Sequence, residues 1–286
     1  MTERTYCSQA NPEEPMLGTA DVVDVWLLLE YRPVWKARAI DDNELSESVQ
    51  RWLADGIAAL RASGLRVRPQ MIRQPEIDRS DTRLLVHHEG VLREFGSGQA
   101  GYDDLVRTPI ELLVGDSTLG AAVDAPRYFV CTNGRRDLCC ARFGLPAYGR
   151  LRELVGERAW QTTHLGGHRF APNVLVLPQG TLYGRVTPEE TEAFVAEVEN
   201  GGLPAGMLRG RSRYPKLVQA AEGFAGRAGL RLLKVDGDEG QAVVSFAHAQ
   251  ETLRVAIRRS REPFRTLASC GDEESKTVCP FVKSTA

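Results

Sequence analysis

Two cysteines and two histidines in the middle of the chain are the residues best suited to metal chemistry. Cys131 and Cys140 have eight residues between them, and His164 and His168 follow in a second short segment. A thiolate is a strong, soft donor, and a neutral imidazole is the natural nitrogen donor beside it. Two of each suit zinc or an iron–sulfur cluster, and they do not suit a hard cation that prefers oxygen.

The spacing of the two histidines raises the question of whether they lie on a helix or on a loop. Residues four apart share one face of a helix. However, Gly166 and Gly167 stand between His164 and His168, and each glycine costs about 1 kcal/mol relative to alanine inside a helix. We therefore expect a tight loop, in which glycine lets the backbone approach a bulky cluster and donate N–H groups to it.

Other interpretations of these residues remain open at this point. The same four ligands could hold a structural zinc ion, which is colourless, whereas an iron–sulfur protein absorbs visible light. Thiol–disulfide chemistry at Cys131, Cys139 and Cys140 is a second alternative, but the chain lacks a C-x-x-C motif at a helix start. A lone histidine or cysteine is commonly a hydrogen-bonded residue or a small buried hydrophobe.

The elements around the cysteines follow a recognisable order. A strand over residues 127–130 runs into Cys131, a helix lies within residues 141–155, and strands are expected over 160–163, 173–177 and 181–186. The last helix is predicted to begin at Thr187, because Thr187 and Glu190 form a capping box with proline at the first helical position.

The first part of the chain predicts the same order of elements. Strands are expected over residues 22–31, 66–72, 83–88 and 91–95, with a helix over 45–60 closed by Gly64 and a helical pattern over 102–114. The fold class is therefore α/β with two thioredoxin-like βαβ-ββα repeats. A right-handed βαβ crossover leaves the first strand's end beside the next helix's start, so the segment from Cys131 to Cys140 lies at one edge of the sheet.

The pattern divides the chain into three predicted domains. Residues 1–120 form a degenerate thioredoxin-like domain, residues 121–202 a thioredoxin-like ferredoxin domain, and residues 203–286 a small α+β extension. The extension is expected to contain a helix over 214–228 and a meander of strands over 230–235, 242–247 and 252–257. The polar ends, residues 1–19 and 271–286, are expected to be irregular.

Two long motifs carry a resemblance to a known family. They read Cys131-Thr-Asn-Gly-Arg-Arg-Asp-Leu-Cys-Cys-Ala-Arg-Phe-Gly and Thr-His164-Leu-Gly-Gly-His168-Arg-Phe-Ala-Pro-Asn. With Leu-Tyr183-Gly-Arg-Val they resemble the sucrase/ferredoxin-like family, most strongly over residues 130–186. The resemblance implies a thioredoxin-like ferredoxin domain whose [2Fe–2S] cluster has two cysteine and two histidine ligands and differs from a Rieske centre.

Carried over to this chain, the resemblance implies that Cys131, Cys140, His164 and His168 bind the cluster. Adjacent Cys139 stands where many members have another residue, and Asn133 stands where a histidine is common. The implied function is a soluble electron carrier or redox sensor rather than a stand-alone enzyme. Neutral imidazoles in place of two thiolates should raise the reduction potential above that of an all-cysteine ferredoxin.

The partners are an electron donor and an acceptor that the sequence does not identify. Because there is no G-x-G-x-x-G or P-loop motif, a separate reductase must supply the electrons. The sucrase half of the family name finds no support, since no spacing singles out the pair of carboxylates that glycoside hydrolysis requires.

Composition and charge argue against several classes of protein: nucleic-acid-binding, membrane and secreted. Lysine and arginine number 36 against 38 acidic residues, so no basic field indicates a nucleic-acid or membrane partner. The apolar runs are far shorter than a membrane span, and the start lacks an apolar signal-peptide core. Six cysteines are too few for a secreted disulfide scaffold of this length. A cytoplasmic location is therefore expected.

The remaining polar residues near these motifs receive simpler interpretations. Asp137 could brace its loop by accepting backbone N–H groups, and Arg135, Arg136 and Arg169 either favour the reduced cluster or form ordinary ion pairs.

The cysteines and histidines outside the two motifs also receive simple interpretations. Cys7 is expected to be a free thiol in a flexible leader. Cys270 and Cys279 repeat the gap between Cys131 and Cys140 by coincidence, and the other three histidines are predicted to be surface residues: His87, His88 and His248.

Overall fold

The computed structural model describes residues 6–98 and 101–284 of the 286-residue chain. The α-helices are α1 (Cys7–Ala10), α2 (Glu47–Ala62), α3 (Tyr102–Leu105), α4 (Ile110–Gly115), α5 (Leu138–Val155), α6 (Thr191–Glu199) and α7 (Lys216–Ala225). The strands are β1 (Val25–Glu30), β2 (Val67–Arg73), β3 (Arg83–His88), β4 (Val91–Gly96), β5 (Ala121–Ala122), β6 (Arg127–Cys131), β7 (Ala159–Thr162), β8 (Val174–Leu177), β9 (Thr181–Tyr183), β10 (Leu208–Arg211), β11 (Arg231–Gly237), β12 (Gln241–His248), β13 (Glu251–Arg259), β14 (Phe264–Thr266), β15 (Lys276–Val278) and β16 (Phe281–Lys283).

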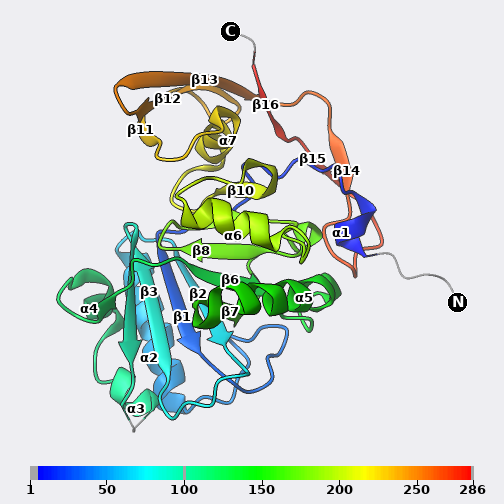
Figure 1. Cartoon of the computed structure of the whole chain (residues 1–286). Helices are drawn as coiled ribbons and strands as arrows, with labels where there is room; N and C mark the ends of the chain where they lie inside the picture. The colour runs from blue at the N-terminus through cyan, green and yellow to red at the C-terminus, as the bar shows by residue number, and fades with distance from the viewer. Residues whose placement is uncertain (1–5, 99–100, 285–286) are drawn as a thin grey trace, which may run out of the picture.

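A ten-stranded sheet in the order β10-β9-β8-β6-β7-β2-β1-β3-β4-β5 organises most of the molecule (Figure 1). In the N-terminal half, β1 pairs parallel with β2 and antiparallel with β3, and β3 pairs antiparallel with β4. In the second half, β6 pairs in the same two ways with β7 and β8, and β8 pairs with β9. The predicted α/β class is confirmed, while the thioredoxin-like character of each half stays a prediction.

The helices cover one face of each half of the sheet. Side chains alternate between the faces of a strand, and Val25, Leu27 and Leu29 of β1 pack with α2 in one core. In the second half, Tyr128 and Val130 of β6 pack with α5 and α6 in another core. Figure 1 shows α5 and α6 in front of the second half and α2 behind the first.

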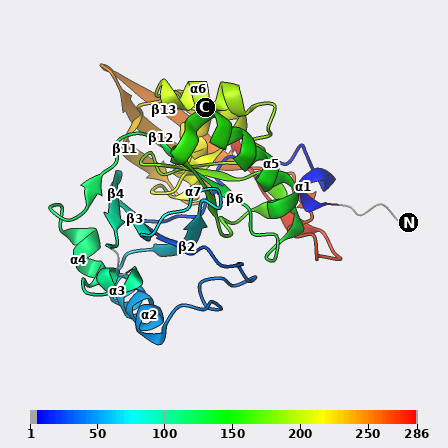
Figure 2. The same ribbon diagram turned by 60° about the horizontal axis from the view of Figure 1, so that its bottom comes forward.

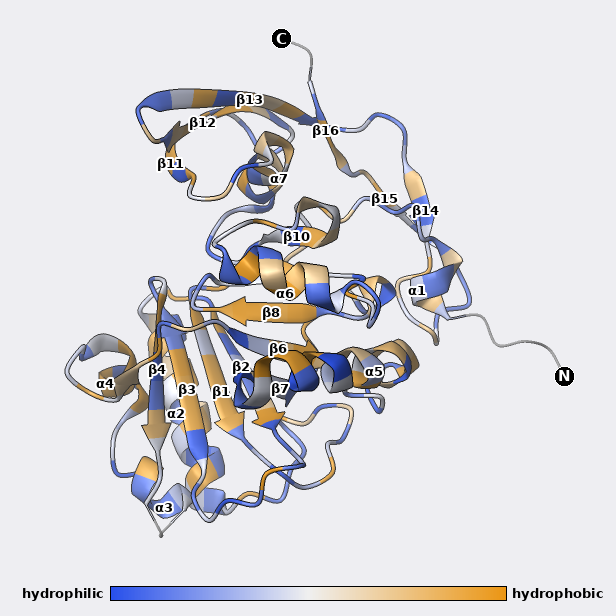
Figure 3. Ribbon diagram, in the orientation of Figure 1, coloured by the Kyte–Doolittle hydropathy of each residue, from blue (hydrophilic) through white to orange (hydrophobic). Residues whose placement is uncertain are grey.

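The opposite faces of the two halves meet each other. Trp26 and Leu28 of β1 belong to one buried cluster with Phe129 of β6 and Leu175 of β8. The central strands are therefore buried on both faces, which explains their nearly continuous apolar sequences (Figure 3). Cys131 and Cys140 are also members of this cluster.

Two predicted helices differ from the observed ones. The pattern over residues 102–114 forms two short helices, α3 and α4, because Pro109 restricts the residue before it and begins a new helix. Helix α6 begins at Thr191 and not at Thr187. Thr187 does bond the carboxylate of Glu190, at 3.0 Å, but residues 188–190 form a turn that precedes the helix.

The C-terminal part contains the predicted helix and meander. Strands β11, β12 and β13 form an antiparallel sheet that β16 extends, and α7 packs against it (Figure 2). The expectation of irregular ends was wrong for the residues that the structure describes, since these include α1, β15 and β16. No helix in the described part of the chain is long and apolar enough to cross a membrane.

His87 is buried, which contradicts its prediction as a surface residue. It lies on β3 opposite Trp26, on the face where the two halves meet, and its Nε2 lies 2.8 Å from the carbonyl oxygen of Pro178. Its Nδ1 is buried and has no hydrogen-bond partner among the described residues. Burial lowers the pKa of His87 to about 4, and the nearby His88 acts in the same direction. His88 and His248 are partly exposed.

The depressed pKa of His87 predicts a loss of stability on mild acidification. Between about pH 6.5 and pH 4 the unfolded chain binds a proton that the folded chain does not, so the free energy of unfolding falls as pH falls. Across this window the depressed pKa of His87 changes the free energy of unfolding by about 3 kcal/mol. We expect His87→Gln to reduce the pH dependence of urea unfolding by most of this amount. An equal pH dependence of the free energy of unfolding in the wild-type protein and in His87→Gln would contradict the assignment.

Candidate metal centre

Cys131 and Cys140 are brought together by the β6–α5 connection. Cys131 ends β6 and its N–H donates to the carbonyl of Asn173 at 3.0 Å. Cys140 lies in the first turn of α5, which begins at Leu138, three residues before the predicted helical segment. Helix α5 packs so closely that a Cβ on Gly144 would stand 2.1 Å from the carbonyl oxygen of Cys131. Glycine at position 144 therefore permits the approach of the two cysteines.

The histidines lie on the connection after β7, as the glycines between them predict. Gly166 and Gly167 have φ values of +82° and +66°, which only glycine adopts freely. His168 opens a single 3-10 turn, His168–Phe170, that follows this bend. The predicted tight loop is thus confirmed, and it turns both imidazoles toward the same region.

Three of the four predicted ligands converge closely. The donor atoms of Cys131, Cys140 and His164 all lie within 4.8 Å of one another, and Sγ of Cys140 is 3.8 Å from Nδ1 of His164. His168 is outside this group of three, but its ring centroid is 5.0 Å from that of His164. Both cysteines are buried, whereas the two histidines are only partly buried. The imidazoles therefore form the side of the centre nearest the surface.

The N-terminal half of the sheet holds the histidine loop in place. Arg68 and Gln70 on β2 both donate to the carbonyl oxygen of His164, at 3.0 and 3.3 Å. The hydroxyl of Thr163 donates to the side chain of Gln70 at 2.7 Å. Asn133, where the family often has a histidine, donates to the carbonyl of Lys36 at 3.0 Å. Both ligand loops are thus braced by the other half of the molecule.

A buried arginine, which sequence reasoning missed, supports the same loop. Arg209 on β10 donates to the carbonyl of Gly166 at 2.9 Å, to the Asn173 side chain at 2.8 Å and to the carbonyl of Thr19 at 2.9 Å. Burial lowers its pKa to about 10. No local pattern marks Arg209, because its partners lie at least 36 positions away in the sequence.

Asp137 braces the start of α5, as predicted. Its Oδ1 accepts the N–H of Cys139 at 2.9 Å, and its Oδ2 accepts the N–H of Cys270 at 3.0 Å. Burial alone would raise its pKa, but these N–H groups and the nearby His168 together hold the pKa of Asp137 below its ordinary value. Its Oδ2 is 3.6 Å from Nδ1 of His168.

The flanking arginines Arg169 and Arg136 have different surroundings. Arg169 donates to both carboxylate oxygens of buried Glu14, at 2.8 and 2.9 Å, so it forms an ordinary ion pair. Arg136 lines a surface pocket of about 280 Å³ beside His164, together with Arg38 and Arg68. The surface next to the exposed side of the centre is therefore rich in arginine.

The donor set fits a metal or iron–sulfur group. Interactions with Cys140 and His164 outweigh burial and hold the pKa of Cys131 well below its ordinary value. Nδ1 of His168 is buried and has no hydrogen-bond partner in the described part of the chain. Buried soft donors with an unsatisfied imidazole nitrogen are expected where a thiophilic metal binds.

The other cysteines did not all behave as predicted. Cys7 is not in a flexible leader, because it lies on α1 and is 1% exposed. Cys7, Cys139 and Cys270 form a second group with Asp137. Cys279 is exposed and outside both groups, so the equal spacing of Cys270 and Cys279 has no counterpart in the structure. All six cysteines are free thiols.

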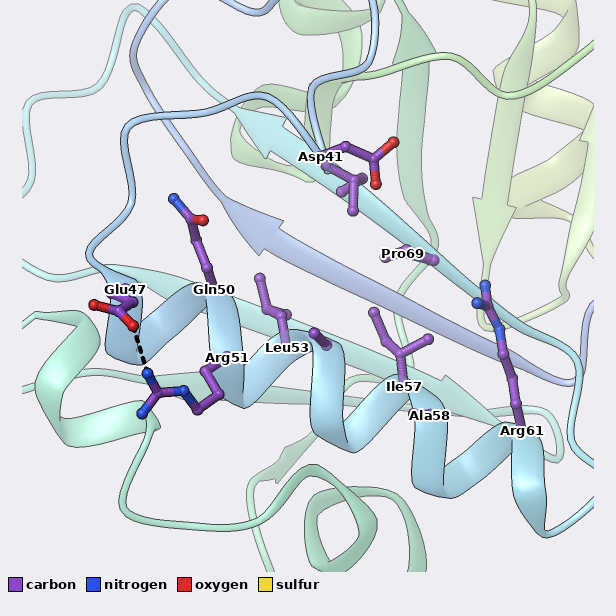
Figure 4. A pocket seen from close by; sticks show the side chains of 11 residues that line it. Asp41, Glu47, Gln50, Arg51, Leu53, Ile57, Ala58, Arg61 and Pro69 are labelled. Atoms are coloured by element: carbon purple, nitrogen blue, oxygen red, sulfur yellow. Dashed lines mark hydrogen bonds and ion pairs between the residues drawn. The ribbon is translucent and has the colours of Figure 1, made fainter.

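A larger pocket lies away from these residues. It has a volume of about 730 Å³ and runs along α2, where Leu53 and Ile57 form its floor with Pro69 of β2 (Figure 4). Its charged rim includes Glu47 and Arg51, which pair with each other one turn apart. No cysteine or histidine lines it, so its size does not connect it with the metal-binding chemistry.

Comparison with known proteins gives one match. A family model described as Sucrase/ferredoxin-like matches residues 16–210, a range that includes all four predicted ligands. No curated protein matches the chain, and no solved structure matches it.

Proposed function

Because this chain belongs to the sucrase/ferredoxin-like family, we propose that it is an electron-transfer protein with a [2Fe–2S] cluster. Cys131, Cys140, His164 and His168 bind this cluster. The observation that carries the proposal is the convergence of two buried cysteines and His164 within 4.8 Å, with the ring of His168 5.0 Å from that of His164. Electron transfer accounts for the difference in exposure between the ligands: Cys131 and Cys140 are buried, whereas His164 and His168 are partly exposed, so that one side of the centre is near the surface.

The protein controls the redox properties of this centre through its ligands. When bound, the cluster supplies a one-electron redox group. Neutral imidazoles leave it less negative than four thiolates would, so its potential is higher than that of an all-cysteine ferredoxin. The two cysteines that would hold the cluster are buried, and His164 and His168 are the partly exposed ligands nearest the surface.

The domain organisation forms part of the proposal. Residues 1–120 and 121–202 are two thioredoxin-like domains, and residues 203–286 are an extension. The second domain holds the cluster, and the first supports it through the bonds of Arg68 and Gln70 to the His164 carbonyl. The electron donor and acceptor are separate proteins. The location is cytoplasmic, where a reducing environment preserves free cysteines.

Electron paramagnetic resonance of the reduced protein tests the proposal. A dithionite-reduced [2Fe–2S] protein has one unpaired electron per cluster, so we expect a paramagnetic signal that integrates to about one spin per chain. The oxidised protein should be red-brown and silent. A colourless protein without this signal would contradict electron transfer.

A structural zinc ion at the same four residues is the second candidate. The short separations between the donor atoms of Cys131, Cys140 and His164 favour it, because a single tetrahedral ion needs a compact set of ligands. Zinc at this site would stabilise the fold without any redox activity. The absorption spectrum distinguishes the two candidates.

A further inference from the structure

Three cysteines from distant parts of the chain meet beside the N-terminus of α5. Cys7 lies on α1, Cys139 in the first turn of α5, and Cys270 on the segment between β14 and β15. Figures 1 and 2 both show α1 next to the start of α5. The sulfur–sulfur distances are 3.5 Å for Cys7 and Cys139, 3.2 Å for Cys139 and Cys270, and 3.7 Å for Cys7 and Cys270.

These distances are near those of ligands around one ion. A tetrahedral zinc with Zn–S bonds of about 2.3 Å places its sulfurs about 3.8 Å apart. Two of the three sulfur–sulfur separations, 3.5 and 3.7 Å, are within about 0.3 Å of this value, and the third, 3.2 Å, is about 0.6 Å shorter. A disulfide would require about 2.05 Å between two of them and would leave the third without a role.

Asp137 offers the fourth donor. Its Oδ1 is 3.9 Å from Sγ of Cys7, and its carboxylate belongs to the same group, whose donor atoms all lie within 4.8 Å of one another. Bonds from the N–H groups of Cys139 and Cys270 and from the Ser269 hydroxyl fix the orientation of this carboxylate. Cys7, Cys139 and Asp137 are buried, and Cys270 is partly exposed, so an ion has a way in.

We propose that Cys7, Cys139, Cys270 and Asp137 form a second metal site, which binds one Zn²⁺ ion. The site uses none of the four residues assigned to the [2Fe–2S] cluster. The ion ties α1 and the segment between β14 and β15 to the start of α5, next to the residues that hold the cluster. The N-terminal end of the 18-residue helix α5 favours the negative charge of the thiolates.

Metal analysis of the full-length protein tests this site independently of the cluster. We expect about one zinc per chain, in addition to any iron. Cys7→Ser and Cys270→Ser should each lower the zinc content at least tenfold while iron and acid-labile sulfide remain. Cys279→Ser is the matched control, because Cys279 lies outside the group, and it should keep the zinc.

Cobalt provides a second measurement that does not depend on how much zinc survives purification. In a Cys131→Ser background, which disables the first donor set, chelator-treated protein titrated with Co²⁺ should develop the visible absorption of a tetrahedral thiolate complex, with an end point at one ion per chain. Cys7→Ser and Cys270→Ser should not develop it, whereas Cys279→Ser should. The proposal is overturned if all four proteins bind zinc and cobalt equally, or if mass spectrometry shows a disulfide within this group.

Discussion

Replacing Cys140 by serine is expected to remove the iron and acid-labile sulfide from the purified protein almost completely. Cys140 is fully buried between α5 and the sheet, and its sulfur is 3.8 Å from Nδ1 of His164. A serine hydroxyl is a hard, weakly acidic donor and does not replace a thiolate toward iron. Because outer-shell changes already lower metal affinity by about 10- to 100-fold, the loss of a ligand should exceed this range.

The matched variants distinguish the loss of a cluster ligand from a general loss of folding. Cys131→Ser should behave as Cys140→Ser does, and His164→Ala and His168→Ala should also lose the cluster or shift its visible absorption. Cys279→Ser changes an exposed cysteine and should retain full iron and sulfide. Circular dichroism checks that each variant is folded. Full retention of iron in folded Cys131→Ser and Cys140→Ser would exclude these cysteines as ligands.

Replacing Gly144 by alanine is the second change with a large expected effect. The added Cβ would stand 2.1 Å from the backbone oxygen of Cys131, well inside van der Waals contact, and neither atom is at the end of a flexible side chain. Helix α5 must therefore move away from β6. Overpacking of this kind costs about 3 kcal/mol or more, and it would also separate Cys140 from Cys131.

Gly149 provides the control for this prediction. It lies on the same helix, is exposed, and has no atom within 4 Å of an added Cβ. Gly149→Ala should therefore stabilise the protein by up to about 1 kcal/mol through helix propensity alone. Urea unfolding measures both changes, and iron content reports on the centre. Similar stability of the two variants would show that α5 does not pack on Cys131 as described.

The sequence predicted the features that depend on local patterns. The strand β3 was predicted at its observed bounds, and the helix α2 within a few residues, because alternation and helical periodicity are signals carried by neighbouring residues. The loop of His164 and His168 was also predicted, since Gly166 and Gly167 disfavour a helix. The start of α6 was predicted wrongly because Thr187 and Glu190 close a turn with the same side-chain bond that would cap a helix.

The features that the sequence did not predict depend on contacts between distant residues. Nothing near Cys7 or Cys270 indicates that their sulfurs lie 3.7 Å apart, because 263 positions separate them. His87 looks like a residue at a strand end, but the curling of the sheet buries it against Pro178. Arg209 likewise gains its role only when β10 joins the edge of the sheet.

The content of iron and acid-labile sulfide in anaerobically purified wild-type protein tests the central claim most directly. The account predicts about two irons and two sulfides per chain, together with red-brown colour that disappears in Cys131→Ser and Cys140→Ser. Zinc at the second site does not affect this result, because zinc brings no sulfide. A folded, colourless protein with zinc but neither iron nor labile sulfide would contradict the claim.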